Sequence, residues 1–271
     1  MIGDRYGLAL SLILAGAAAC QPTNQQAPAD AVETADSGED FVGPIERAHS
    51  AGTWRQKQAL QSGIVVRFGG NTIVEGRMLT TPSMSRTRLD LESGPVAIWD
   101  GADVWVAPAG ADFPQARFHA LTWPYFLLAP IKLRDPGARV APLGERELRG
   151  SSFETAKLSF DAGVGDTPDD WYVLYRSPES GRLAAMAYIV TFGTSQEEAE
   201  KEPHAVTYDE YTDVEGVPIP TRWTFWMWSE EQGIHGEPIG EVTLQDPAFV
   251  TPPEDAFTLP QGARKEELPA S

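Results

Sequence analysis

The segment from Trp171 to Phe192 constrains the fold of this chain more than any other part of it. Residues 171–176 are rich in aromatic and β-branched side chains, and residues 177–181 combine proline, serine and glycine, so the segment predicts two strands joined by a turn. In residues 183–192, alternate side chains fall on opposite faces, and both faces are largely apolar. Such a strand is covered on both sides, either by packed core or by a cavity for an apolar guest.

Strand patterns also recur through most of the remaining chain. They fall at residues 64–68, 72–80, 84–92, 96–99, 104–106, 138–143, 145–148, 153–161, 205–211, 221–228 and 241–244. Residues 69–71 and 100–103 predict tight hairpin turns, and residues 213–220 predict a turn-rich link. We expect about ten or eleven strands at the spacing typical of all-β folds.

Helical patterns are confined to the start and the middle of the chain. Residues 43–51 and 54–60 predict two short helices. Residues 113–128 carry apolar side chains at helical spacing, and Pro124 interrupts them. Residues 196–202 are a charged excursion that we expect to be solvated.

The predicted fold class is mainly β (α+β), in one domain without repeats. A single curved antiparallel sheet forms an incomplete β-barrel, with short helices at the N-terminus and a central helical insertion covering the concave side.

The composition of the chain excludes some partners. Its 271 residues are 42% hydrophobic, and 39 acidic against 21 basic residues give a net charge of -18. Such a surface repels nucleic acid and anionic lipid headgroups, and we interpret the acidity as a source of solubility rather than as a site for a basic partner. Because Cys20 is the single cysteine, disulfides within the chain and thiolate metal sites are excluded. We expect a monomer.

Residues 1–19 predict a signal peptide of the lipoprotein type. Arg5 supplies positive charge, residues 8–14 are an apolar run too short to span a membrane, and residues 17–19 are small. Cys20 follows directly, and this arrangement resembles a bacterial lipoprotein signal, in which the cysteine is lipidated by acyl chains such as palmitate. The alternative is an ordinary secretory signal with an incidental cysteine.

The segment after Cys20 predicts a tether. Gln21 follows the cysteine, and the resemblance to enterobacterial sorting signals then implies attachment to the outer membrane, on its periplasmic side. Residues 20–40 are too polar to bury much surface, so they predict a flexible tether with a reach on the order of 25 Å. Residues 41–265 are the predicted folded domain, and residues 266–271 a flexible tail.

Catalytic and metal-binding motifs are absent from the sequence. It has no phosphate-binding glycine loop, no nucleophile elbow and no metal-type histidine pair. The histidines are scattered at His49, His119, His204 and His235. His49 lies near the end of a predicted helix, where a lone histidine is typically a packing or capping residue. We therefore expect no enzyme, no metal and no cofactor.

Two groups of aspartates need an interpretation. Asp100 and Asp103 flank a tight turn, and we interpret them as turn formers. Asp166, Asp169 and Asp170 cluster before Trp171, and their spacing does not match a calcium loop. We interpret this second group as a solvated acidic loop.

Several stretches of this chain resemble an uncharacterised group of bacterial lipoproteins whose fold is like that of the lipoprotein carriers LolA and LolB. They are Ala48-His49 with Gly52 and Trp54, residues 125–137 (YFLLAPIKLRDPG), residues 161–166 with Trp171-Tyr172 and the turn from Ser177-Pro178 to Leu183, and Phe257 with Pro260-Gln261-Gly262. Together they cover most of residues 43–263. The resemblance implies an incomplete β-barrel with a hydrophobic concave face, partly covered by helices, and a possible acyl-chain ligand.

The leading hypothesis is a membrane-anchored binding module of the cell envelope. Its half-barrel cavity would hold an acyl chain, a lipid or an acylated protein. The candidate lining residues are apolar or aromatic side chains of the predicted strands and central helix: Trp99, Trp105, Tyr125, Trp171, Met186, Tyr188, Trp223 and Phe225.

Two other hypotheses remain open. The first is a non-enzymatic structural or protein-interaction module of the periplasm with a solidly packed interior. The second, ranked lowest, is a periplasmic hydrolase with His119 or His204 as base, for which the sequence shows no nucleophile.

Overall fold

The structure, a computed structural model, describes residues 40–269, so Cys20, the predicted signal segment and most of the predicted tether lie outside the described residues. Within this range, thirteen strands form one sheet. They are β1 (Ala59–Phe68), β2 (Asn71–Thr80), β3 (Thr87–Leu91), β4 (Val96–Trp99), β5 (Val104–Ala107), β6 (Ala138–Leu148), β7 (Ser151–Phe160), β8 (Tyr172–Arg176), β9 (Leu183–Tyr188), β10 (His204–Val214), β11 (Val217–Ser229), β12 (Gly233–Val250) and β13 (Arg264–Glu266).

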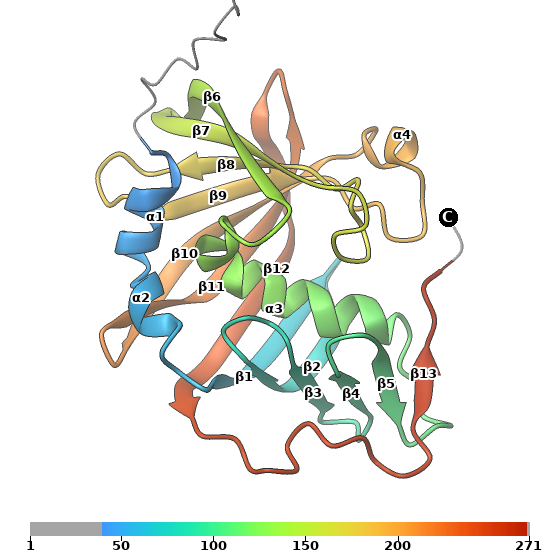
Figure 1. The fold of residues 1–271 in the computed structure, drawn as a ribbon. Helices are drawn as coiled ribbons and strands as arrows, with labels where there is room; N and C mark the ends of the chain where they lie inside the picture. Colours follow the sequence, from blue (N-terminus) through green and yellow to red (C-terminus); the bar gives the residue numbers. More distant parts are fainter. Residues whose placement is uncertain (1–39, 270–271) are drawn as a thin grey trace, which may run out of the picture. The chain divides into compact units, whose positions relative to one another are not determined.

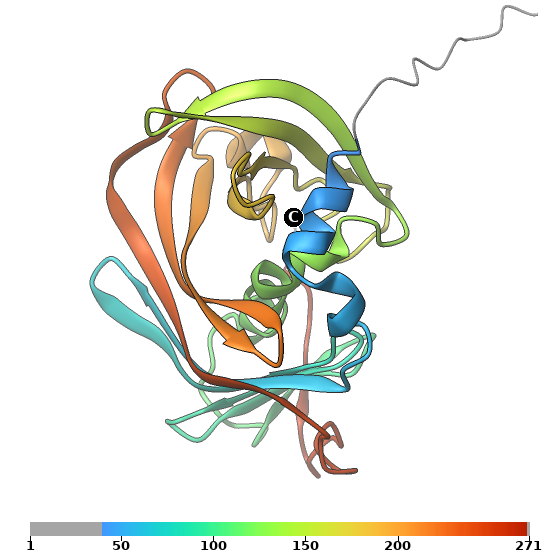
Figure 2. The same ribbon diagram turned by 90° about the vertical axis from the view of Figure 1, so that its left-hand side faces the viewer.

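The sheet is antiparallel throughout and open at both ends. Its order is β13-β5-β4-β3-β2-β1-β12-β11-β10-β9-β8-β7-β6, and the pairing of β1 with β12 joins its two halves. The end strands β6 and β13 are not neighbours, so the strongly curved sheet is a half-barrel (Figures 1 and 2). The predicted fold class is therefore confirmed.

The helices lie on the concave side or at the rim. They are α1 (Val42–Ala48), α2 (Ala51–Trp54), α3 (Ala116–Lys132) and α4 (Gln196–Ala199). Figure 2 shows the sheet curving around α3, with α1 and α2 at the open side of the curve. In the described part of the chain, no helix combines the length and hydropathy needed to cross a membrane.

Two prolines lie inside α3, and each removes one hydrogen bond of the helix. Pro124 and Pro130 have no N–H group, so the carbonyl oxygens four residues earlier, those of Ala120 and Phe126, lose their helical donors. A buried carbonyl without a donor is costly, so both oxygens need other partners.

Side chains of the sheet satisfy both freed carbonyls. The Thr87 hydroxyl of β3 donates to the Ala120 oxygen at 2.8 Å, and the Tyr208 hydroxyl of β10 donates to the Phe126 oxygen at 2.6 Å. The two donors come from opposite halves of the curved sheet. The two prolines therefore do not break α3. The carbonyls that they set free accept hydrogen bonds from the sheet, and these bonds attach the helix to the sheet at two points.

The β8–β9 hairpin is covered on both faces, as its sequence predicts. Met186 and Tyr188 belong to the inner core, where the Tyr188 ring lies 5.1 Å from that of Phe126 in α3. Ala185 and Ala187 point to the other face, into a second, outer cluster. This outer cluster consists of Leu148, Val173, Tyr175, Ala185, Ala187, Ala205 and Trp228.

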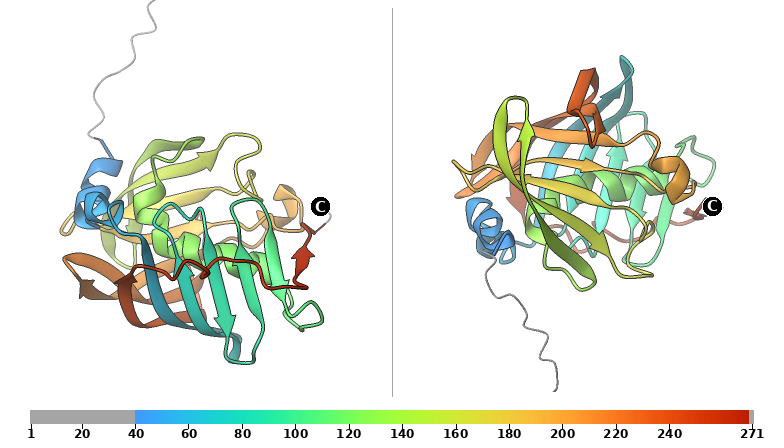
Figure 3. Two further views of the ribbon diagram at one scale, coloured as in Figure 1. Left: turned by 60° about the horizontal axis from the view of Figure 1, so that its bottom comes forward. Right: turned by 90° about the horizontal axis from the view of Figure 1, so that it is seen from above.

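The segment after β12 crosses the outside of the sheet. Figure 3 (left) shows it passing over β1–β5, where the Arg88 guanidinium donates to the Ala256 carbonyl at 3.0 Å. The chain then returns as β13, which pairs with β5. Glu266, the last residue of β13, lies one position beyond the predicted end of the domain.

Several predicted boundaries need correction. The sheet has more strands than the ten or eleven expected, partly because β13 has too few residues to show a pattern. The expected link at 213–220 is mostly strand: β10 and β11 meet in a turn at Glu215 and Gly216, both with positive φ. The strand predicted at 241–244 is the middle of the much longer β12, whose glycines and prolines resemble loop residues.

The helical predictions also differ in detail. The second helix ends at Trp54, and residues 59–60, expected to be helical, open β1 instead. Helix α3 continues through Pro124 without a break because of the side-chain hydrogen bonds described above. The strand expected at 183–192 ends at Tyr188, beyond which the backbone N–H of Thr191 donates to a side chain.

Candidate functional site

A cavity of about 360 Å³ lies between α3 and the ends of β7, β8 and β9. Residues of the β2–β3 turn and of the loop at 161–171 also line the cavity, which is partly open to solvent. Most of its wall is apolar or aromatic: Met84, Trp99, Phe118, Leu121, Tyr125, Phe126, Ala138, Phe160, Val164, Tyr172, Tyr188, Val190 and Phe192. The concave side is therefore partly filled by α3 and partly hollow.

Three tyrosines form one part of this wall. The ring of Tyr172 lies 5.6 Å from that of Tyr125 and 6.0 Å from that of Tyr188. Burial raises the pKa of all three hydroxyls, so they are neutral phenols. Among the described residues, none of these hydroxyls has a hydrogen-bond partner, yet none is a fully enclosed unsatisfied group. Their oxygens are therefore accessible from the cavity.

Two ion pairs lie at the rim. The nearly buried Arg117 of α3 binds Asp166 of the loop through two hydrogen bonds of 2.6 and 2.8 Å. This hydrogen bonding raises the pKa of the Arg117 guanidinium. At the C-terminal end of α3, Lys132 pairs with Asp135 and donates to the Ser83 carbonyl at 3.2 Å. The pairs attach the walls of the cavity to α3.

Asp170 is a buried carboxyl group in the wall. It is 7% exposed and accepts hydrogen bonds from the Thr191 N–H (2.7 Å), the Thr191 hydroxyl (2.7 Å) and the Thr167 hydroxyl (2.8 Å). Burial raises its pKa despite these three donors. The interpretation of residues 166–170 as a solvated acidic loop is therefore wrong for Asp170 and for the paired Asp166, and only Asp169 is exposed.

Three of the eight predicted lining residues are in the wall of this cavity: Trp99, Tyr125 and Tyr188. Trp99 ends β4, where its indole N–H donates to the Met84 carbonyl at 3.1 Å. Tyr125 comes from the middle of α3, and Tyr188 ends β9. The structure brings these three together from three separate elements.

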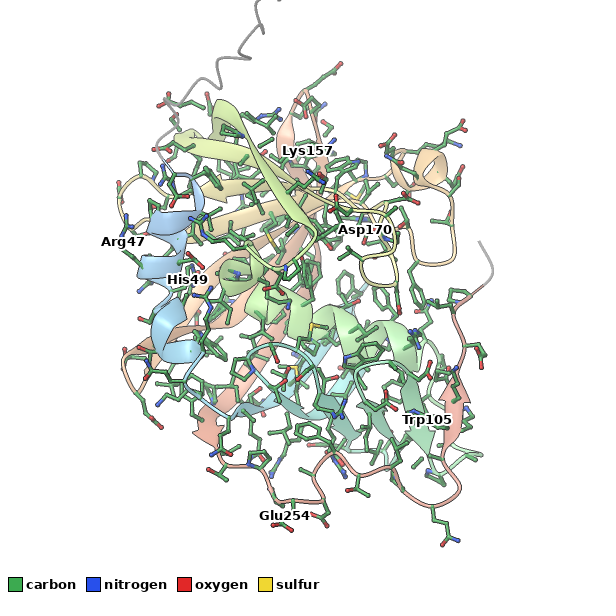
Figure 4. All side chains as sticks on the ribbon, in the orientation of Figure 1. Arg47, His49, Trp105, Lys157, Asp170 and Glu254 are labelled. Atoms are coloured by element: carbon green, nitrogen blue, oxygen red, sulfur yellow. The ribbon has the colours of Figure 1, made fainter. Side chains whose placement is uncertain are left out.

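The other five predicted residues lie elsewhere. Met186, Trp223 and Phe225 are fully buried in the inner core, and the Phe225 ring packs 5.7 Å from that of Phe126 in α3. Trp105 lies on the opposite face of β5 from the core residues Val104 and Val106, and its indole donates to Asp100 (Figure 4). Trp171 lies beside the outer cluster and donates to Glu200 at 3.1 Å.

Four other lining residues are not among the predicted ones, although the pattern of the sequence could have identified them. Phe118 and Leu121 have the same helical spacing as Tyr125, and Val190 and Phe192 share a predicted strand face with Tyr188. Asp170 is different, because only the fold reveals that Thr167 and Thr191 meet at its carboxyl group.

Two of the histidines accept hydrogen bonds that hold the fold together. His49 packs between α1 and β9, where its Nε2 accepts the Leu183 N–H at 3.1 Å, so its interpretation as a packing residue is confirmed. The Nδ1 atom of His119 accepts the Trp123 indole N–H at 3.2 Å. Within residues 40–269, no hydroxyl or thiol forms a hydrogen bond with a histidine, and no group of three metal-type side chains is found.

Comparisons with known proteins give a fold. No family profile matches the chain, and no curated protein matches its sequence. A DUF1329 family protein from Desulfovibrio piger superposes with a TM-score of 0.51 at 11% identity, over 81% of this chain and 97% of that one. A LolA superfamily protein from Nitrosomonas europaea gives 0.48 at 11% identity, over 79% and 97%.

These structures define the class of this protein by its fold. It is an open antiparallel half-barrel with helices on its concave side, and its architecture is similar to that of the Desulfovibrio piger protein. At this sequence identity the likeness is one of architecture.

Proposed function

We propose that this protein is a non-enzymatic binding module of the cell envelope that holds one apolar ligand between α3 and the sheet. The observation that supports this most is the cavity itself, whose wall is largely aromatic and aliphatic. Filling such a space with hydrocarbon removes apolar surface from water. This burial contributes a favourable free energy of about 25 cal/mol per Å² of apolar surface.

The size of the cavity favours one ligand chain over several. Small-molecule pockets measure roughly 300–1,000 Å³, and about 360 Å³ lies at the lower end of that range. We infer a lipid-like molecule, or one acyl chain of a lipid or lipoprotein, with its apolar part among Phe118, Leu121 and Val190.

The proposal includes an attachment to the membrane. The predicted signal, the lipidated Cys20 and the tether that ends near residue 40 would anchor the domain to the outer membrane on its periplasmic side. Several acyl chains at about 0.8 kcal/mol per buried CH₂ make such attachment lasting. The domain of residues 41–265 would then meet its ligand close to the bilayer.

The test is to fill the cavity and measure binding. Leu121 lies in the wall on α3, so Leu121→Trp should remove much of the free volume. We expect a fluorescent fatty-alcohol probe to bind the wild-type protein and to bind Leu121→Trp at least about tenfold more weakly, a loss of about 1.4 kcal/mol.

The matched control is Ile73→Trp on β2, where the isoleucine is 43% exposed and outside the cavity. This variant should bind like the wild type, and thermal unfolding of both variants reports any loss of structure. Equal binding by a folded Leu121→Trp would place the ligand elsewhere, and absence of binding by the wild type would favour the structural alternative.

A further inference from the structure

We propose that the cavity takes a single-chain amphiphile whose head carries an ammonium group, and that Asp170 and the three wall tyrosines bind this head. The inference rests on the proposed function and adds the chemical class of the head. The class of the head is inferred from the charged groups in the wall of the cavity and from its unpaired hydrogen-bond acceptors.

Of the four charged side chains in the wall, three belong to ion pairs among the described residues and one does not. The charged wall residues are Lys132, Asp135, Asp166 and Asp170. Lys132 pairs with Asp135, and Asp166 pairs with Arg117. Among the described residues, Asp170 forms no ion pair, and the charge of Asp169, which is also negative, contributes to raising its pKa. The wall therefore has a net negative charge at Asp170.

The partners of Asp170 leave it able to accept one more donor. A carboxylate offers about four acceptor positions, and Asp170 uses three of them for Thr167 and Thr191. All three donors are neutral, so they orient the group without cancelling its charge. A buried carboxylate without a counter-ion is costly, and burial raises its pKa accordingly. A cationic ligand head would supply the missing charge.

The three wall tyrosines offer two further kinds of contact to an ammonium group, through their hydroxyl oxygens and through their ring faces. Tyr125, Tyr172, Tyr188 and Asp170 line the same cavity, and the ring of Tyr172 lies 5.6 Å from that of Tyr125 and 6.0 Å from that of Tyr188. The charge of Asp170 adds to the effect of burial in raising the pKa of all three tyrosines. Their unpaired hydroxyl oxygens can accept N–H donors. Their ring faces attract cations, by about 0.5–2 kcal/mol each depending on desolvation. Figure 4 places Asp170 above α3, beside the ends of the strands.

The same wall disfavours an anionic head. A fatty-acid carboxylate would meet the Asp170 charge in a space of low dielectric, where like charges repel most strongly. Among the described residues, Lys132 is the one cation in the wall and pairs with Asp135, and Arg117 at the rim pairs with Asp166. An alcohol head escapes the repulsion but offers no counter-charge, so it should rank between the amine and the acid.

The test compares three probes with the same chain: dodecylammonium, dodecanol and dodecanoate. Each displaces the fluorescent probe from the full-length protein, below its critical micelle concentration. We expect dodecylammonium to bind about tenfold or more tightly than dodecanoate, as charge-assisted hydrogen bonds of about 1.5–3 kcal/mol imply, with dodecanol between them. Equal affinities, or tighter binding of dodecanoate, overturn the inference while the proposed function stands; binding of none of the three overturns the proposed function itself.

A pair of variants assigns the preference to Asp170. Asp170→Asn removes the charge and should abolish the tenfold difference between the amine and the acid. Asp169→Asn removes the same charge one residue away, on an exposed side chain outside the cavity, and should preserve the difference. A preference that survives Asp170→Asn contradicts the assignment, and the wild-type comparison decides the inference even if that variant does not fold.

An ammonium group can belong to a simple amine or to a lipid headgroup. Lysophosphatidylethanolamine and lysophosphatidylglycerol with the same acyl chain separate these sources, because only the first carries the ammonium group. Tighter binding of the first identifies a lipid headgroup as the ligand. If neither lysolipid binds and dodecylammonium does, a simple alkylamine is the ligand.

Discussion

At the scale of single residues, His49 links the end of α1 to the start of β9. It is 2% exposed and accepts the Leu183 N–H through Nε2, so it must be neutral in the folded protein. Burial, together with the charge of Arg182, lowers the pKa of His49 from 6.5 to about 3. A proton on this ring would remove the acceptor and place a charge in the core.

The lowered pKa of His49 predicts acid sensitivity. Below pH 6.5 the unfolded chain binds a proton that the folded protein excludes, so stability is fully present above that pH and falls towards pH 3. For one histidine, the free energy of unfolding changes with pH by at most about 1.4 kcal/mol per pH unit. We expect His49→Gln, which can still accept the Leu183 N–H, to lose less unfolding free energy on acidification than the wild type in urea titrations.

The control for this prediction is His235→Gln, a change at a partly exposed histidine outside the core. This variant should keep the wild-type pH dependence. A slope that His49→Gln leaves unchanged would mean that other groups, such as the buried His119, whose pKa burial lowers to about 4, cause the acid sensitivity.

At the scale of elements, α3 determines how much of the half-barrel is hollow. Its position depends on hydrogen bonds from Thr87 and Tyr208 to carbonyls that Pro124 and Pro130 set free. On the side that faces β11, Trp123 and Phe126 pack against the Phe225 ring. The cavity lies beside Phe118, Leu121 and Tyr125 of α3, and residues of the loop at 161–171 also line it.

This arrangement predicts coupling between Tyr208 and Pro130. Tyr208→Phe should lower the free energy of unfolding by about 1–3 kcal/mol, because it leaves the Phe126 carbonyl buried and unpaired. Pro130→Ala restores the helical N–H for that carbonyl, so Tyr208→Phe should cost clearly less in a Pro130→Ala background. Chemical denaturation of the four proteins gives the coupling energy. Equal costs in both backgrounds would show that the tyrosine hydroxyl does not replace the lost helical bond.

The sequence predicts elements best where one physical signal dominates. The β8–β9 hairpin is recognised because its strands are apolar on both faces and its turn contains proline and glycine. The turn at Gly69 and Gly70 is recognised because both residues can adopt positive φ. In contrast, β12 is predicted too short because Gly240, which suggests a loop, makes room for the Phe68 ring, a contact that only the fold creates.

The candidate site is predicted less completely for the same reason. The apolar spacing of α3 and β9 locates Tyr125 and Tyr188, whereas large aromatic side chains such as Trp223 and Phe225 are equally typical of packed core. Burial of Asp170 depends on the meeting of segments far apart along the chain, and local composition favours a solvated loop.

At the scale of the whole molecule, an open sheet has two edges to protect. Edge β6 contains Pro142 and a bulge before Gly144, both of which discourage pairing with another chain. At the other edge, the short β13 covers β5 and is held by hydrogen bonds from Arg264 to the Ala109 and Ala111 carbonyls, 2.8 and 2.7 Å.

Removal of β13 should therefore promote association. A chain truncated after Ala263 loses the whole of β13 and exposes the backbone of β5, so we expect oligomers or aggregates in light scattering after size exclusion. A chain truncated after Glu267 keeps β13 and should remain monomeric. If both truncated chains behave alike, β13 is not needed to protect the edge.

We propose above that the cavity beside α3 holds an apolar ligand. The most direct test of this proposal is native mass spectrometry of the full-length protein, purified from its native host in mild detergent, for the wild type and for Leu121→Trp. We predict one non-covalent lipid-like species on the wild type, released by organic solvent, and little or none on Leu121→Trp. A wild-type protein that carries no such species, or a variant that carries it equally, would contradict this account.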